Sequence, residues 1–327
     1  MPPESADPRT PDPDGTGDGQ RSRRGRMLAM ARRLYLAVLA GLIVWLLADR
    51  HVEVSEMLEG ARPALLAAAL ACSFGLILCN SALWRSALLM LGHDVPLDAT
   101  VMAAARSLPA RYVPLGVSYA AARMALLRSG GVPIAPLAIT AGIELALSAS
   151  VALAAGVSLL GAAGALTGGA AWTVAALAAA TVAVLPALGG RAINRLLARR
   201  GARFAVDWRD YLRVLAVALG YWGWAAFTFV LYLRAFPAAD SLPSVEIAGA
   251  FMVSWALGFL ALLAPQGFGV AELSLVAILS VEGRSGVAVA AVYAGYRVVL
   301  IARDILAAGT AEIISTRRAR RVSAPRD

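Results

Sequence analysis

The sequence contains no lysine, so all 30 of its positive charges are arginine, and only 16% of its 327 residues are charged. Cysteine and histidine are also scarce. Cys72 and Cys79 lie seven residues apart in one apolar segment and are interpreted as small core side chains, whereas His51 and His93 lie in separate loops. A disulfide framework and a cluster of metal ligands are therefore excluded, and we expect no metal and no cofactor.

Polar stretches long enough to form a soluble domain are missing as well. The longest polar stretches are the N-terminal segment and the loop around Arg200, and neither can bury a core of its own. We therefore expect no soluble catalytic or nucleotide-binding domain, no catalytic residues and no enzymatic activity. In contrast, 59% of the residues are hydrophobic, against about 45–50% in an average globular protein, which predicts a membrane protein. The arginines cluster at the ends of apolar segments, so the net charge of +9 is explained by membrane topology rather than by nucleic acid.

A helix needs about 20 apolar residues to cross a bilayer. Six segments meet this requirement: Leu28–Ala48, Ala64–Trp84, Ile134–Leu160, Ala170–Leu188, Tyr211–Phe236 and Gly286–Ile313. The chain is accordingly divided into a disordered N-terminal tail (1–27), a transmembrane domain (28–315) and a basic C-terminal tail (316–327).

Two further apolar segments, Asp98–Arg128 and Val245–Val281, are interrupted near their centres. The residues that interrupt them are proline and glycine: Pro109, Pro114 and Gly116 in the first, and Pro265, Gly267 and Gly269 in the second. Both interruptions contain Pro-x-Gly, which suggests an inverted repeat of the transporter type.

The distribution of arginine predicts how these segments run. Residues 21–33 carry six arginines and no acid, and residues 189–209 carry six arginines and one acid, so both should be cytoplasmic, as should the basic C-terminus. The number of crossings then requires each interrupted segment to begin and end on the same side. We predict an all-α polytopic fold of about six transmembrane helices and two re-entrant helical hairpins. In the alternative, residues 98–128 cross once and the 189–209 arginines lie outside.

Charged residues also occur within the apolar segments: Arg106, Arg111, Arg123, Arg297 and Arg303, with Glu144, Glu272 and Asp304. Structural ion pairs between helices would explain any one of them. The cations outnumber the acids, however, so at least two are expected to have no partner within this group and to be available for a mobile anion. Arginine binds phosphate through two parallel hydrogen bonds, and a helix beginning near Val270 would add backbone donors.

Two sequence motifs resemble a known family. Residues 106–116, followed by Arg123 and Glu144, and residues 265–272 are similar to the two motifs of the lysylphosphatidylglycerol synthase transmembrane-region family. The resemblance covers about residues 30–315. Ala110 and Leu115 depart from the first motif.

The resemblance implies flippase-like translocation of an anionic lipid, or of a polyprenyl-phosphate-linked glycolipid, between leaflets of the cell membrane, with both termini cytoplasmic. The expected headgroup-binding residues are Arg106, Arg111, Arg123, Glu144, Gln266, Gly267, Gly269, Glu272 and Arg297. The expected hairpin tips are Pro109, Pro114, Gly116 and Pro265. The aminoacyltransferase domain of the full-length synthases has no counterpart, so lysyl transfer is not expected. The expected partner is a membrane lipid, and a homo-oligomer is left open.

Two other functions are compatible with the sequence. One is a membrane-embedded glycosyltransferase that uses a polyprenyl-phosphate donor, but the predicted outer loops are short: residues 161–169 have no charge and residues 236–244 have only Asp240. The other is a non-transporting subunit of an envelope-assembly complex.

Overall fold

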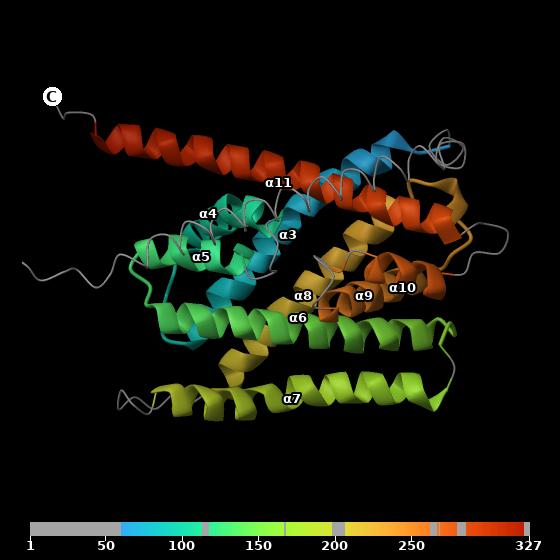
Figure 1. The fold of residues 1–327 in the computed structure, drawn as a ribbon, viewed down its shortest axis with the longest axis horizontal. Helices are drawn as coiled ribbons and strands as arrows, with labels where there is room; N and C mark the ends of the chain where they lie inside the picture. The colour runs from blue at the N-terminus through green and yellow to red at the C-terminus, as the bar shows by residue number, and fades with distance from the viewer. Residues whose placement is uncertain are drawn as a thin grey trace, which may run out of the picture. The chain divides into compact units, whose positions relative to one another are not determined.

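The computed structural model describes residues 60–112, 118–166, 168–197, 207–261, 267, 269–279 and 286–323. These residues are helical and contain no β-strand (Figure 1). The helices are α3 (Pro63–Met90), α4 (Leu97–Ser107), α5 (Ser118–Ser129), α6 (Ile134–Ala162), α7 (Gly169–Leu197), α8 (Trp208–Leu233), α9 (Ser244–Leu260), α10 (Val270–Ile278) and α11 (Gly286–Ser323), with 3-10 turns η1 (Leu108–Tyr112) and η3 (Pro237–Ala239). The predictions for residues 1–27, the first span (28–48), Pro114, Gly116, Pro265 and Gln266 lie outside the described residues.

Three helices, α3, α6 and α8, are long and apolar enough to cross a membrane. They coincide with three of the predicted spans, so these predictions of helices are confirmed. Their starts follow from local chemistry: α3 has proline at its first position, where no backbone N–H is needed, and the Asp207 carboxylate caps α8 by accepting a hydrogen bond from the Arg209 N–H at 3.0 Å.

The two remaining predicted spans in the described residues are also helical, but their boundaries differ. Helix α7 begins at Gly169, one residue before the predicted span, and continues beyond its predicted end at Leu188 to Leu197. In α11, the helix continues beyond the predicted end at Ile313 and through the basic segment to Ser323. Alanine and arginine favour helix in this stretch, and the next proline is Pro325, so no proline stops the helix earlier.

Both interrupted segments form pairs of helices in contact with each other, as their prolines and glycines predict. The first runs through α4, the 3-10 turn η1 and α5, which we call hairpin 1; the second consists of α9 and α10, which we call hairpin 2. Pro109 lies in η1, because proline cannot continue the hydrogen bonding of an α-helix. Gly267 and Gly269 have φ values of +68° and +83°, a conformation that ends the helical path before α10 begins.

The hairpins pack against opposite halves of α6. Leu137 and Ala141, near the start of α6, are buried together with Leu127 of hairpin 1. Near the end of α6, Gly156 meets Gly249 of hairpin 2 so closely that a Cβ at Gly249 would lie 2.8 Å from the Gly156 carbonyl oxygen. In Figure 1, α4 and α5 accordingly lie towards one end of α6, and α9 and α10 towards the other.

The contacts among eight helices follow a repeated scheme. If α3 to α6 are matched in order with α8 to α11, each contact has a counterpart. The α3–α4, α4–α5, α5–α6 and α3–α6 contacts correspond to α8–α9, α9–α10, α10–α11 and α8–α11. Between the groups, α4–α11 corresponds to α6–α9, and α6–α8 to α3–α11. Each hairpin therefore packs against the long helix that follows it and against the long helix that ends the other group.

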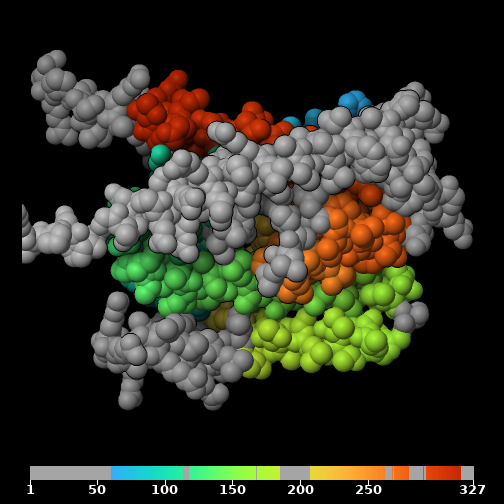
Figure 2. All heavy atoms as spheres, viewed as in Figure 1, coloured from blue at the N-terminus to red at the C-terminus, as the bar shows by residue number. Residues whose placement is uncertain are grey.

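The outer surface carries large apolar side chains. Leu177 on α7 and Leu273 on α10 are 63% and 70% exposed. In the view of Figure 2, α7 and hairpin 2 lie at the surface. Exposed apolar area of this extent is unusual for a water-soluble monomer and is typical of a surface that contacts lipid.

Candidate functional site: charged groups inside the helical bundle

The first charged group joins α3, α5 and α6. The Glu144 carboxylate on α6 accepts hydrogen bonds from Asn80 Nδ2 at 2.5 Å and from the Trp84 indole N–H at 2.6 Å, both on α3. Arg123, on α5, donates from Nη1 to Asn80 Oδ1 at 2.5 Å, and its guanidinium lies 4.2 Å from the centre of the Trp84 ring. Asn80 therefore connects a cation to a carboxylate that do not contact each other directly.

Arg123 is 0% exposed, yet it is incompletely paired. Its Nε and Nη2 atoms are buried and have no hydrogen-bond partner in the described part of the chain. An arginine at membrane depth costs at least about 2.5–3.5 kcal/mol on insertion scales, and such side chains normally find partners. The arrangement thus leaves two adjacent donors of a buried cation directed at no acceptor among the described residues.

The second group is centred on Asp304, which is 2% exposed on α11. Its Oδ1 accepts from Arg303 Nε at 2.8 Å and also pairs with Arg303 Nη2. Its Oδ2 accepts from the Tyr112 hydroxyl at 2.8 Å and lies 3.6 Å from Arg111 Nη1, both in η1. Arg303 Nη1 also donates to the Ser73 carbonyl at 3.2 Å. One buried carboxylate thereby fixes hairpin 1 to α11.

The third group fixes hairpin 2 to α11. Glu272, in the first turn of α10, accepts from the Gly269 N–H at 2.7 Å and lies 2.8 Å from Arg297 Nε. Two effects favour a glutamate at this position. Its side chain caps the N-terminus of its own helix, and the helix dipole stabilises a negative charge there. The Arg297 guanidinium is also 5.5 Å from the Tyr293 ring centre.

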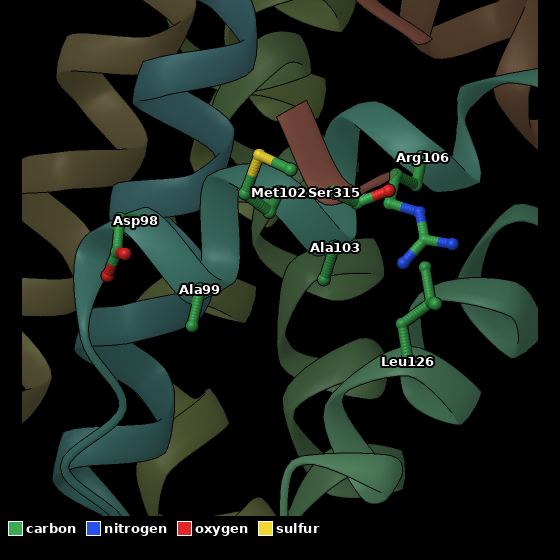
Figure 3. Close-up of a pocket in the computed structure, with 7 residues that line it drawn as sticks. All are labelled: Asp98, Ala99, Met102, Ala103, Arg106, Leu126 and Ser315. Carbon is green, nitrogen blue, oxygen red and sulfur yellow. The ribbon is translucent and has the colours of Figure 1, made fainter. Parts of the chain in front are cut away.

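Arg106 lies apart from these groups. Its Nε is 3.0 Å from Glu312 of α11, and both side chains are exposed. Arg106 lines a pocket of about 310 Å³ between α4, α5 and α11 (Figure 3). The other lining residues are Asp98, Ala99, Met102, Ala103, Leu126 and Ser315.

Aromatic side chains connect the first two charged groups. Tyr221 on α8 interacts electrostatically with Glu144 of the first group and with Arg111 and Arg303 of the second. The Arg111 guanidinium also lies 4.7 Å from the ring centre of Tyr119. Tyr221 therefore lies near charged residues of both groups.

The two predicted glycines of hairpin 2 have different surroundings. A Cβ at Gly267 would lie 2.5 Å from the carbonyl carbon and oxygen of Gly258 on α9, so this glycine is required by a contact between two backbones. A Cβ at Gly269 would meet nothing within 4 Å. The sequence suggested that both glycines let a lipid headgroup approach the backbone. At Gly267, close packing against α9 explains the glycine instead, whereas at Gly269 the space around the backbone is free. In hairpin 1, the Pro109 side chain is exposed.

The expected excess of cations is smaller than the sequence indicated. Arg106 pairs with Glu312, which the count of acids had omitted, and Arg111 shares Asp304 with Arg303. Arg123 and Glu144 come together in one group, as do Gly269, Glu272 and Arg297. Sequence reasoning missed the polar residues of α3 and η1 that complete these groups: Asn80, Trp84 and Tyr112. A signal for Asn80 existed, because an amide within an apolar span requires a partner.

Fold and charged groups together define an all-helical integral membrane domain with ionised side chains inside its helical bundle. Residues 33–307 match the family described as the lysylphosphatidylglycerol synthase TM region. The chain belongs to this family, which confirms the resemblance inferred from its two motifs. Among curated proteins, none matches the chain.

Proposed function

We propose that this protein translocates an anionic lipid, or a polyprenyl-phosphate-linked glycolipid, between the leaflets of the cell membrane, and that it is not an enzyme. Membership of the family supports a membrane-embedded, flippase-like domain. The observation that carries the proposal is Arg123, a fully buried cation on α5 whose Nε and Nη2 have no acceptor among the residues that the structure describes.

A lipid phosphate is the anion that suits these two donors. A phosphodiester has two non-bridging oxygens, and arginine binds such a pair through parallel hydrogen bonds that are stronger than neutral ones. One side of the Arg123 guanidinium is already occupied by Trp84 and Asn80. In the proposed mechanism the phosphate occupies the other side, while the lipid tails remain in the bilayer.

The hairpins provide the route. They pack against opposite halves of α6. If α6 crosses the membrane, hairpin 1 enters from one face and hairpin 2 from the other, which is the arrangement of the proposed six spans with two re-entrant hairpins. The matched contacts of the two helix groups agree with an inverted repeat, whose two halves open alternately to the two sides. The arginine-rich segments favour cytoplasmic termini.

The experiment is a leaflet-resolved assay in proteoliposomes that hold the full chain and fluorescent phosphatidylglycerol, in which an impermeant quencher reports the lipid still in the outer leaflet. Arg123→Gln keeps a polar side chain but removes the charge. A charge-assisted hydrogen bond is worth about 1.5–3 kcal/mol, so we expect translocation to slow by roughly tenfold or more. Arg213→Gln is the matched control, because Arg213 is exposed and pairs only locally with Asp210.

Equal rates in vesicles with and without the protein, across phosphatidylglycerol and a polyprenyl-phosphate lipid, would refute translocation. Equal rates for Arg123→Gln and Arg213→Gln would refute the assignment of the phosphate to Arg123.

A further inference from the structure

The described part of the bundle holds three carboxylates, Glu144, Glu272 and Asp304, and their environments differ. Asp304 pairs directly with the buried Arg303. Glu272 lies 2.8 Å from the cationic Arg297 and accepts a backbone N–H, so its negative charge is compensated directly. Within the described residues, Glu144 accepts hydrogen bonds from Asn80 and Trp84 alone, and both are neutral. The cation of its group, Arg123, is reached through Asn80. Glu144 is therefore the carboxylate whose protonation costs no direct ion pair.

The hydrogen bonds around Glu144 have a fixed polarity. Both carboxylate oxygens face donors, Asn80 Nδ2 and the Trp84 N–H, so the structure shows the geometry of an ionised Glu144. A protonated Glu144 must donate its O–H, and neither neighbouring group can accept it as they stand. The Asn80 amide can accept only if it turns its oxygen towards Glu144. That oxygen is the one that accepts from Arg123 Nη1, so the turn removes the hydrogen bond of Arg123 to the protein.

The surrounding charges act in the same direction. The helices packed against α6 are α3, α5, α7, α8 and α9. On α8, Tyr221 lies within electrostatic range of Glu144. Residues 169–184 of α7 and 247–260 of α9 contain no charged residue. An anion bound to Arg123 would place a second negative charge near Glu144, and a proton on the carboxylate would offset that charge.

We propose that Glu144 takes up one proton from solvent when an anionic headgroup binds Arg123, so that proton and phosphate are bound and released together. This inference rests on the proposed function. The step is a simple protonation. The carboxylate gains a proton to become a carboxylic acid, and Asn80 turns to accept its O–H. Arg123 loses the hydrogen bond from Nη1 to Asn80 and holds the phosphate through Nε and Nη2. The loaded site then carries no more net charge than the empty one. By thermodynamic linkage, protonation of Glu144 raises the affinity for the anion by the same factor by which the bound anion raises the affinity for the proton.

The test is calorimetry of dihexanoylphosphatidylglycerol binding to the full chain in detergent, in two buffers with different ionisation enthalpies. This probe is a phosphodiester and does not itself titrate near neutral pH, so the buffer dependence counts protons taken up by the protein. The wild type should take up about one proton per bound lipid, and its affinity should fall by up to about tenfold per pH unit as the pH rises. Glu144→Gln should bind the lipid with no proton uptake and no such pH dependence.

Glu246→Gln is the matched control, since Glu246 lies in the first turn of α9, away from the charged groups, and it should keep the uptake. Lipid binding without proton uptake in the wild type would overturn the inference and leave the proposed function intact. Uptake that persists in Glu144→Gln would overturn the assignment to Glu144. No lipid binding at all would count against the proposed function itself. If Glu144→Gln fails to fold, infrared difference spectra of the wild type must show a protonated carboxyl on lipid binding, and their absence would overturn the inference.

Discussion

The contact between Gly267 and Gly258 offers a test of how hairpin 2 is built. Alanine at Gly267 meets two obstacles. Its φ of +68° is strained for an L-residue, which costs roughly 1–3 kcal/mol. Its Cβ would also lie 2.5 Å from the Gly258 carbonyl, a backbone group that cannot rotate away, and overpacking of this kind costs about 1–3 kcal/mol. We expect Gly267→Ala to destabilise the protein by roughly 2–6 kcal/mol in total.

Two matched substitutions separate these terms. Gly269→Ala has the strained φ of +83° but open space around its Cβ, so it should lose only the conformational part. Gly258→Ala has an ordinary helical backbone, but its Cβ would lie 2.9 Å from the Ala271 Cβ and 3.3 Å from the Gly267 oxygen. Gly142→Ala on α6 is the control for helix propensity, because it meets nothing within 4 Å and should gain up to about 1 kcal/mol.

The assay is thermal unfolding of the purified full chain in one detergent, followed by the loss of monodisperse protein. The expected order of apparent Tm is Gly142→Ala highest, then Gly269→Ala, with Gly267→Ala lowest. If Gly267→Ala is as stable as Gly269→Ala, and Gly258→Ala is as stable as Gly142→Ala, the two backbones do not touch and the described packing of hairpin 2 is wrong.

Two further predictions concern ion pairs. Asp304→Asn leaves the buried Arg303 without its carboxylate and should lower the free energy of unfolding by about 3–5 kcal/mol. The double variant Arg303→Leu, Asp304→Leu should recover much of this loss in the same unfolding assay. If it recovers none, the two residues do not form a buried pair. At the surface, the hydrogen bonds from Arg62 hold the pKa of Asp240 below its ordinary value of 3.8, so the pair stabilises the folded state at neutral pH and loses this effect as the pH falls through the lowered pKa. Asp240→Asn should therefore lower the apparent Tm slightly at pH 7, and the Tm difference from the wild type should shrink as the pH falls. A Tm difference that grows in acid would refute a stabilising Arg62–Asp240 pair.

Much of the fold follows from the sequence because the bilayer imposes it. A span needs a minimum length of apolar residues, and α3, α6 and α8 satisfy that rule with few charges. Pro109 and the glycines at 267 and 269 interrupt helices for local reasons that do not depend on the partners. Helix α11 extends past the apolar span that ends at Ile313 to Ser323, because helix propensity continues where apolarity stops.

The candidate site was predictable as a set of residue types but not as a set of partners. Arg123 and Glu144 are 21 residues apart, and their connection depends on Asn80, a third residue on another helix. Glu312 was taken as part of the last span's end, yet it lies one turn along α11 from the pocket and pairs with Arg106. Such pairings arise only when helices distant in sequence pack side by side, and a count of charges along the chain does not contain that information.

One helix serves both hairpins. Arg297, the partner of hairpin 2, and Asp304, the partner of hairpin 1, are seven residues apart on α11, which is two turns, so they lie on nearly the same face about 10 Å apart. A displacement of α11 therefore pulls on both ion pairs together, and neither hairpin can be released without strain on the other. In the proposed translocation mechanism, such coupling would disfavour a state that is open to both sides of the membrane at once, and would thereby limit ion leakage.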